Sequence, residues 1–303
     1  MLFQIVNNEN GTIYNYEFDS LNELASYIET TPVNKKSFYK LTSEESDDNN
    51  SFFGTNNFSE AFTLCKYGVD PSKITEFLKF NEELEAKLPY LTKDRSRVEN
   101  VYGIRPNIQK FLRGNPKSMY SLKRFTPRGI IDVYYNVSIK ATASHDLILK
   151  RGVCSIQLVK LLEKLGYIVS FNLVSLSRVN DEYIYANIKI KNDNEYIDTV
   201  TSYFPMCHPS FPRRIMFRLK EVTPYKKVYQ NYGVVVSLDS FLERNEDSKK
   251  IIIPDTDDFS KVSGNIDEYF LKLCETVNIN QFLNEQEELA YDNKQKKLYI
   301  RSI

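Results

Sequence analysis

Residues 130–190 constrain the fold more than any other part of this sequence. Residues 130–139 are rich in β-branched and aromatic side chains, which favours a strand. Residues 146–165 carry apolar side chains at helical spacing, and the glycine that follows them is typical of a helix C-terminus. Residues 167–176 and 183–190 predict two further strands joined by a tight turn.

A strand, a crossover helix and a second strand form the repeating unit of parallel sheets, and such crossovers are right-handed in almost all proteins. This order predicts an α/β fold, with a central Rossmann-like sheet and flanking helices, over residues 130–280. Folds of this kind bind ligands at the carboxyl ends of their strands. A ligand site is therefore expected in the loop that follows residues 130–139.

The flanking regions predict smaller units. Residues 1–91 begin with a hairpin around an Asn-Gly turn and continue with short helices, which indicates a smaller α+β N-terminal region. Residues 42–50 are polar and lack periodicity, so we expect an exposed loop there. Residues 92–129 are predicted to form a basic connecting segment, and residues 281–303 a charged C-terminal tail.

Composition excludes several classes of protein. The chain has 303 residues, and its 40 basic side chains balance 40 acidic ones, which argues against a wholly basic nucleic-acid-binding protein. Two histidines exclude a multi-histidine metal site, and the four cysteines form no CxxC pair. The GxGxxG, P-loop and HExxH motifs are missing from the sequence. We therefore expect no cofactor and no bound metal.

Hydropathy gives no indication of a membrane partner. No stretch approaches the roughly 18 consecutive apolar residues that a transmembrane helix requires. The first residues also lack the basic region with which a signal peptide begins. We expect reduced cysteines and a cytosolic location.

The loop after the first central strand carries Asn136-Val137-Ser138-Ile139-Lys140. This stretch resembles the Asp-x-Ser-x-Ser loop of von Willebrand factor A domains, in which a carboxylate and two hydroxyls hold a divalent cation. Here an amide replaces the carboxylate, and a lysine replaces the second hydroxyl. The resemblance implies a von Willebrand A-like domain with a degraded metal site. We assign Asn136, Ser138, Lys140 and Asp198 to that site.

Three other groups of residues carry catalytic side-chain types. Ser144-His145-Asp146 and Cys207-His208 are adjacent along the chain, and neighbouring residues rarely reach the geometry of a triad or a nucleophile–base pair. We therefore favour structural roles and assign no catalytic residue. A divergent nuclease or transferase would instead require Asp132, Asp146 and Asp198 to converge in space.

Two basic stretches are candidate nucleic-acid contacts. Arg213 and Arg214 lie in a predicted helix over residues 209–221, where an internal salt-bridge network is the favoured alternative to phosphate binding. The longer stretch interleaves cations with aromatic residues, as single-strand binding proteins do. Its basic residues are Arg95, Arg97, Arg105, Arg113, Lys117, Lys123, Arg124 and Arg128, and its aromatic residues are Tyr102, Phe111, Tyr120 and Phe125.

Several short motifs occur in an order that resembles a family of tailed-phage proteins. They are Phe53-Gly54-Thr55, Phe58-Ser59-Glu60-Ala61, Tyr67-Gly68, Pro106-Asn107-Ile108, Gly114-Asn115-Pro116, Met119, Arg151-Gly152, Leu158, Leu162-Glu163, Gly166-Tyr167, His208-Pro209-Ser210-Phe211, Arg213-Arg214 and Phe217. Together they cover roughly residues 50–225. The resemblance implies a phage-encoded protein in the host cytoplasm or in the virion, and it implies no particular chemistry.

Two functional hypotheses follow. The first is a non-catalytic interaction protein that binds a phage or host protein, in virion assembly or on a host factor. The alternative is a nucleic-acid-binding protein of phage replication or DNA packaging, acting through residues 95–128. The sequence leaves the oligomeric state open.

Overall fold

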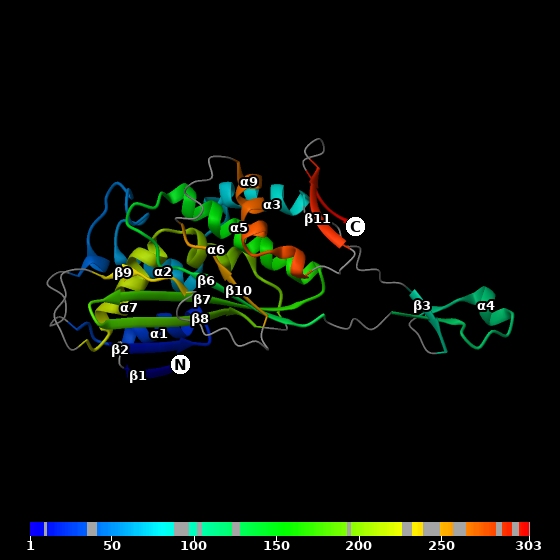
Figure 1. Ribbon diagram of the computed structural model, residues 1–303, viewed down its shortest axis with the longest axis horizontal. Coiled ribbons are helices and arrows are strands. Elements are labelled where there is room, and N and C mark those ends of the chain that lie inside the picture. The colour runs from blue at the N-terminus through cyan, green and yellow to red at the C-terminus, as the bar shows by residue number, and fades with distance from the viewer. Residues whose placement is uncertain are drawn as a thin grey trace.

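The computed structural model describes residues 1–8, 11–34, 41–87, 97–101, 105–122, 128–192, 195–225, 232–238, 249–256, 265–282, 287–292 and 297–302. The predicted fold class is confirmed, because the main body is a mixed sheet of seven strands with flanking helices (Figure 1).

The main sheet has the strand order β1-β2-β8-β7-β6-β10, with β9 paired to β7. Strands β6, β7 and β10 are mutually parallel, and β8 runs antiparallel to β7. The parallel strands β6 and β7 are joined through helix α5, as the strand–helix–strand pattern predicts. The strands are β1 (Leu2–Asn8), β2 (Gly11–Phe18), β6 (Ile130–Asn136), β7 (Ile168–Val179), β8 (Glu182–Lys191), β9 (Val234–Val235) and β10 (Lys249–Ile253).

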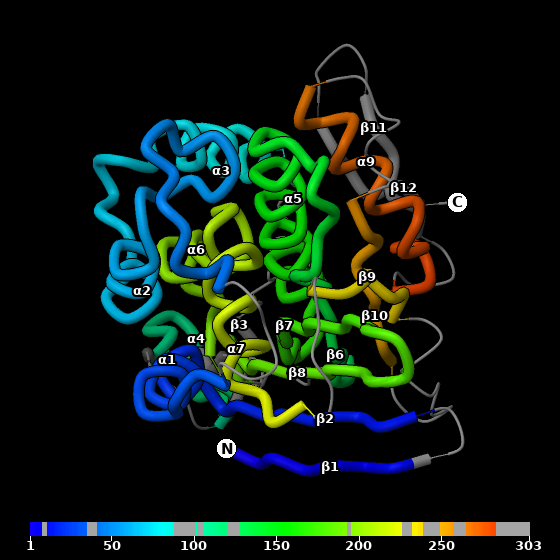
Figure 2. Tube along the Cα trace, turned by 90° about the vertical axis from the view of Figure 1, so that its left-hand side faces the viewer, coloured from blue at the N-terminus to red at the C-terminus, as the bar shows by residue number. Residues whose placement is uncertain are grey.

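The principal core lies between the sheet and a layer of helices (Figure 2). Alternate residues of β7, namely Val169, Phe171 and Leu173, point into it, since side chains alternate between the faces of a strand. The helices of the described ranges are α1 (Leu21–Thr30), α2 (Phe58–Tyr67), α3 (Thr75–Lys87), α4 (Ile108–Leu112), α5 (His145–Lys164), α6 (Thr199–Cys207), α7 (Met216–Val222) and α9 (Ile266–Thr276). Short turns η1 (Thr42–Glu44), η2 (Pro71–Lys73), η3 (Phe211–Ile215) and η5 (Ile279–Phe282) connect them.

The other face of the sheet carries a smaller apolar cluster. Val174 and Leu176 of β7 pack there with Tyr185 of β8 and with Leu238, a residue that follows β9. The two clusters show that β7 is buried on both faces. That double burial explains why its sequence is a nearly continuous apolar run.

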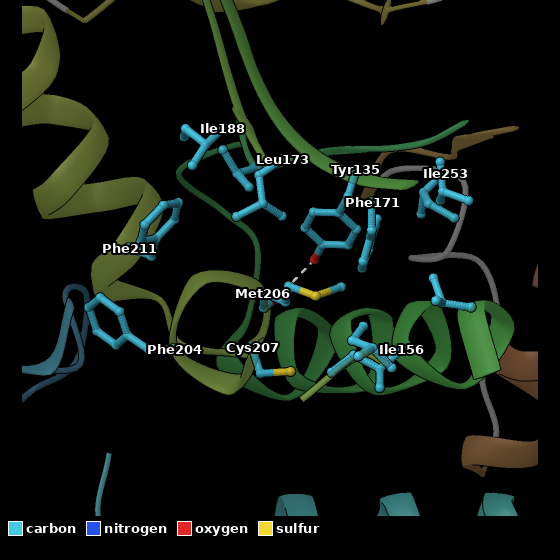
Figure 3. Close-up of a cluster of buried hydrophobic side chains, with 14 of the residues drawn as sticks. Tyr135, Ile156, Phe171, Leu173, Ile188, Phe204, Met206, Cys207, Phe211 and Ile253 are labelled. Carbon is cyan, nitrogen blue, oxygen red and sulfur yellow. Dashed lines mark hydrogen bonds between the residues drawn. The ribbon is translucent and has the colours of Figure 1, made fainter. Parts of the chain in front are cut away.

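Helix α5 lies at the centre of the helical layer. It contacts α3, α6 and α9 as well as β7. Ser144 caps its N-terminus by accepting a hydrogen bond from the backbone N–H of Leu147. Figure 3 shows the core above it, where the hydroxyl of Tyr135 donates to the carbonyl oxygen of Met206 at 2.9 Å. This bond ties β6 to α6 across the core.

The N-terminal hairpin belongs to the main sheet. Strand β2 pairs in parallel with β8, with Tyr14 opposite Ile184. Tyr14 and Tyr16 are fully buried in the principal core. Residues 1–91 therefore share one sheet and one core with residues 130–280, because pairing with β8 places the aromatic side chains of β2 in that core.

Residues 97–122 form a second, small sheet. Strands β3 (Arg97–Asn100) and β4 (Arg105–Pro106) both pair with β5 (Met119–Leu122), and α4 lies between β4 and β5 in the chain. Figure 1 shows this unit set apart from the main sheet. Near the C-terminus, β11 (Glu287–Asp292) and β12 (Lys297–Ser302) form a hairpin within the predicted tail.

Gly152 allows α5 to pack closely against α6. A Cβ atom at this position would lie 2.3 Å from Sγ of Cys207 and 2.7 Å from the carbonyl oxygen of Met206. Real Cβ contacts are not so short, so a side chain here would push the two helices apart.

Substitution Gly152→Ala tests this contact. Helix propensity alone predicts stabilisation by about 1 kcal/mol. We expect instead a destabilisation of about 2 kcal/mol, because the backbone of α6 must move. Chemical denaturation measures the difference. Cys207→Ala in the same background should restore part of the lost stability, and a net stabilisation by Gly152→Ala alone would contradict the close packing.

Candidate functional site

The loop that follows β6 is ordered by side chains from two neighbouring strands. Asn136 is fully buried, and its amide Nδ2 donates to Oδ1 of Asp255 at 3.0 Å. Its Oδ1 accepts from the backbone N–H of Ser138, and the Ser138 hydroxyl lies 3.0 Å from the Ser175 hydroxyl. Lys140 is exposed at the far end of the loop. The structure thus brings Asn136 and Ser138 together.

Asp255 was not identified from the sequence. It follows β10, which runs parallel to β6, so the carboxyl ends of the two strands meet at one edge of the sheet. The signal that would have found it is a carboxylate two residues after the apolar run at residues 251–253. The Asn136–Asp255 hydrogen bond joins an amide to a carboxylate.

Asp198 does not belong to this edge, so the prediction that grouped it with Asn136 was wrong. Its carboxylate caps α6 by accepting from the backbone N–H groups of Val200 and Thr201. The physical reason is strand direction. Helix α6 follows β8, which runs antiparallel to β7 and therefore ends at the opposite edge of the sheet from Asn136.

The three candidate acids do not converge. Asp146 pairs with Lys150 on α5 at 2.9 Å, and Asp198 is used as a helix cap. Within the ranges that the structure describes, no three His, Cys, Asp or Glu side chains are grouped so that they could hold a metal ion. The nuclease or transferase hypothesis loses the carboxylate cluster on which it depended.

Arg151 lies beneath the loop and is almost fully buried. Its Nε donates to the carbonyl oxygen of Pro254, and its NH1 donates to that of Asn136, both at 2.9 Å. The guanidinium stacks on the ring of Tyr135, 4.1 Å from the ring centroid. One cation on α5 therefore joins the carboxyl ends of β6 and β10.

Arg213 and Arg214 are buried, so the hypothesis that they contact the phosphates of a nucleic acid is not supported. Arg213 donates to the carbonyl oxygens of Phe52, Ala141 and Ala143. Arg214 donates to those of Ser43, Glu45 and Thr55. The favoured alternative, a salt-bridge network, is also incorrect for these two residues, because their acceptors are main-chain carbonyls.

Each buried arginine of this region also stacks on a phenylalanine. The guanidinium carbons of Arg213, Arg214 and Arg218 lie 4.3, 4.0 and 4.2 Å from the ring centroids of Phe52, Phe53 and Phe58, respectively. Arg213 and Arg214 belong to η3, a π-helical turn that replaces the start of the predicted helix over residues 209–221. This turn lets two adjacent arginines reach the same segment.

That segment, residues 41–58, is therefore held in place rather than freely exposed. Ser43 is fully buried and its backbone N–H donates to Oε1 of Glu221, while its hydroxyl donates to Oε2. Arg218 bonds Glu44 at 2.6 Å. The prediction of an exposed loop over residues 42–50 was wrong at Ser43, because α7 supplies partners for its polar groups.

The residues of the long basic stretch, residues 95–128, lie in different environments. Arg113 is exposed, whereas Arg128 donates to the carbonyl oxygen of Phe282. Arg97 lies on β3 and Arg105 on β4. Tyr120 lies on β5, and Arg95, Tyr102, Lys123, Arg124 and Phe125 fall outside the described residues.

A concentrated set of exposed apolar side chains lies on α4. Ile108 and Phe111 are each 67 % exposed and Leu112 is 78 % exposed. Arg113 and Lys117, which follow them, are also exposed. We call these five residues the α4 surface. It combines apolar side chains with positive charge on the small sheet.

A pocket of about 360 Å³ lies beside the loop that follows β6. Its only charged lining residues in the described ranges are Arg213 and Lys220. Lys220 is 6 % exposed and its Nζ donates to the carbonyl oxygen of Tyr232 at 2.9 Å. Burial lowers the pKa of Lys220 to about 8. The full lining is Thr42, Phe52, Ser138, Ile139, Ala141, Ser175, Ser177, Pro212, Arg213, Met216, Phe217, Lys220, Tyr232, Gly233 and Val235.

The histidines and Cys207 have structural partners. His145 lies 3.3 Å from the carbonyl oxygen of Phe52, and Nδ1 of His208 accepts from the backbone N–H of Ser210. Burial raises the pKa of the Cys207 thiol well above its usual value. Burial also lowers the pKa of His208 to about 4, and the charge of His145 acts in the same direction. A protonated thiol beside an imidazole held by Ser210 does not form a nucleophile–base pair.

The contacts of Arg214 predict a large effect of Arg214→Lys. A lysine cannot reproduce three donor bonds in a planar fork or the stacking on Phe53. We expect a loss of about 3 kcal/mol in unfolding free energy, measured by denaturation, since buried carbonyls lose their donors. Arg113→Lys is the matched exposed control and should change stability by less than about 0.5 kcal/mol. Equal effects of the two substitutions would contradict the structural role.

His208 predicts a pH dependence of stability. Its pKa is about 4 when folded and about 6.5 when unfolded, so the unfolded chain binds more protons between these values. Stability should therefore fall as the pH decreases from about 6.5 to about 4. The contribution is about 2 kcal/mol after allowance for partial exposure. His208→Asn keeps an acceptor for Ser210 and should flatten this part of the profile. A wild-type profile parallel to that of the variant would refute the assignment.

No helix within the described ranges is long and apolar enough to cross a membrane. A search of curated proteins gave no match, and neither did a search of solved structures. One family model matches residues 4–281, which is most of the chain; it includes the small sheet and nearly all of the main sheet, and the β11–β12 hairpin lies outside it. The chain therefore belongs to the family described as domain of unknown function DUF7192.

Proposed function

We propose that this chain is a non-catalytic interaction protein that binds a protein partner through the α4 surface. The observation that carries the proposal is the exposure of Ile108, Phe111 and Leu112 on one five-residue helix. Large apolar side chains that are exposed together, rather than singly, are characteristic of interaction sites.

Reactive side chains elsewhere in the described residues are buried and held by structural contacts, which supports a role without catalysis. The Cys207 thiol is buried with a raised pKa, and His208 is held by Ser210. Arg213 and Arg214 each donate to three main-chain carbonyl oxygens in the interior. By contrast, the side chains of the α4 surface face solvent, where a partner can reach them.

The chemistry of the α4 surface indicates what the partner presents. Phe111 and Leu112 would fill an apolar groove, since buried aromatic and aliphatic anchors dominate most protein interfaces. Arg113 and Lys117 would meet carboxylates at its rim, where opposite charges favour association. We therefore propose an acidic protein surface with an apolar groove. From the sequence resemblance, we further propose a phage or host protein, met in the host cytoplasm or in the virion.

Nucleic acid is the second candidate, and one observation favours it. Phe111 is exposed beside Arg113 and Lys117, an arrangement on which a base could stack while cations meet the phosphates. The aliphatic side chains of Ile108 and Leu112 have no such use, so a protein partner is the stronger proposal.

The test compares the wild-type chain with the double variant Phe111→Ser, Leu112→Ser. Tagged protein is recovered from the cells in which it is naturally made, and co-purifying proteins are quantified by mass spectrometry. We expect one partner to be reduced about tenfold or more with the double variant, because anchor residues carry most of the binding energy. The purified pair should then reproduce the difference in a direct binding measurement.

Tyr196→Ser is the matched control. Tyr196 is 79 % exposed outside the small sheet, so its loss should leave both recovery and melting temperature unchanged. Equal recovery of all proteins with the double variant would refute the α4 surface. Recovery that disappears after nuclease treatment, together with salt-dependent binding of a single-stranded oligonucleotide, would replace the protein partner with nucleic acid.

A further inference from the structure

The pocket beside the loop that follows β6 lies where ligands bind in other α/β sheets. Ser138, Ile139 and Ala141 contribute that loop to one wall, and Ser175 and Ser177 of β7 contribute another. Strand β6 ends here, at Asn136, and its parallel neighbour β7 continues to Val179. Its volume of about 360 Å³ falls within the range of small-molecule sites.

The charges of the pocket favour an anion. Arg213 and Lys220 line it, and its described lining contains no carboxylate. The Lys220 ammonium has three N–H donors, and the described residues supply one acceptor, the carbonyl oxygen of Tyr232. A buried cation with so few partners gains from a neighbouring negative charge, since desolvation otherwise disfavours its charged form.

Two buried donors on the walls also have no partner among the described residues. They are the hydroxyl of Ser177, a residue only 2 % exposed, and Nε of Arg213, which is 3 % exposed. Buried polar groups in folded proteins almost always have a partner, so an unpaired hydroxyl and an unpaired N–H at one pocket indicate a missing acceptor.

The remaining walls are apolar and aromatic. Phe217 stacks on Tyr232 with ring centroids 4.2 Å apart, and Phe52 lies beneath the guanidinium of Arg213. The apolar part of a ligand would lie against these rings and Met216, next to the two cations. The pocket thus places two cations beside aromatic and apolar side chains.

We propose that this pocket binds a small organic anion, with its phosphate or carboxylate group at Lys220, Arg213 and Ser177 and its ring between Phe52 and Phe217. This site is separate from the α4 surface and does not depend on the proposed partner. The anionic group would accept hydrogen bonds from donors that have no partner among the described residues. The aromatic walls would favour a ligand with a planar or apolar body.

Phenyl phosphate and benzoate are suitable probes, with benzyl alcohol as the neutral control. Titration calorimetry on the full chain should show binding of at least one anionic probe and none of benzyl alcohol. The two anions separate a phosphate site from a carboxylate site. Absence of binding by both anions at millimolar concentration, or equal binding of the neutral alcohol, would overturn the proposal.

Ser177→Ala is the decisive variant. Removing a buried hydroxyl without a partner should leave the free protein as stable as before or more stable. Binding of the anion should nevertheless weaken about tenfold, since one hydrogen bond to a charged acceptor is lost. A purely structural role for Ser177 would leave the affinity unchanged, and that result would refute the site.

Lys220→Met provides a second variant of similar shape that lacks the positive charge. Anion binding should fall by at least about tenfold. Lys79→Met is the matched control, because Lys79 lies on α3 with 72 % of its side chain exposed. If Lys220→Met does not fold, Ser177→Ala alone still decides the question. Retained affinity in a folded Lys220→Met variant would also refute the proposal.

Discussion

Buried guanidinium groups that stack on aromatic rings and donate to main-chain carbonyls organise this structure. Arg151 does so on Tyr135, and Arg213 and Arg214 do so on Phe52 and Phe53. Arg218 also stacks on a ring, that of Phe58, but pairs with the carboxylate of Glu44. A buried cation is costly unless its donors are satisfied. Carbonyl oxygens of irregular segments need donors just as strongly. Hydrogen bonds between an arginine and such carbonyl oxygens meet both requirements. Segments without secondary structure of their own therefore become fixed parts of the interior.

This arrangement sets the geometry of the sheet edge. Arg151 joins the carboxyl ends of β6 and β10, which places Asp255 within hydrogen-bond distance of Asn136. Arg213 reaches across to residues 141 and 143 while it stacks on Phe52. The same side chain therefore forms one wall of the pocket and fixes another. Pocket shape and core stability are consequently coupled, because both depend on the same few arginines.

Local patterns predicted the elements that lie closest together in the chain. The strand at β6, the cap and extent of α5, and the β7–β8 hairpin follow from periodicity and turn residues. Pairing of β2 with β8 could not be predicted, because it joins residues about 170 positions apart and depends on the burial of Tyr14 and Tyr16. The prediction for Asp198 was wrong for a related reason, since the direction of a strand decides at which edge of the sheet the following loop lies. The arginines near residue 214 have the composition of a phosphate site, and only their burial distinguishes the two roles.

The parallel pairing of β2 with β8 has a consequence for synthesis of the chain. Tyr14 hydrogen-bonds Glu182, and 168 positions separate the two residues. At ordinary rates of translation, β8 follows β2 from the ribosome by roughly ten to thirty seconds. Helix α1 can cover Tyr16 and Phe18 during that interval, but Tyr225, which packs on Tyr14, follows even later than β8. Strand β2 is thus among the last to find its place in the sheet, and the nascent chain must remain soluble until β8 emerges.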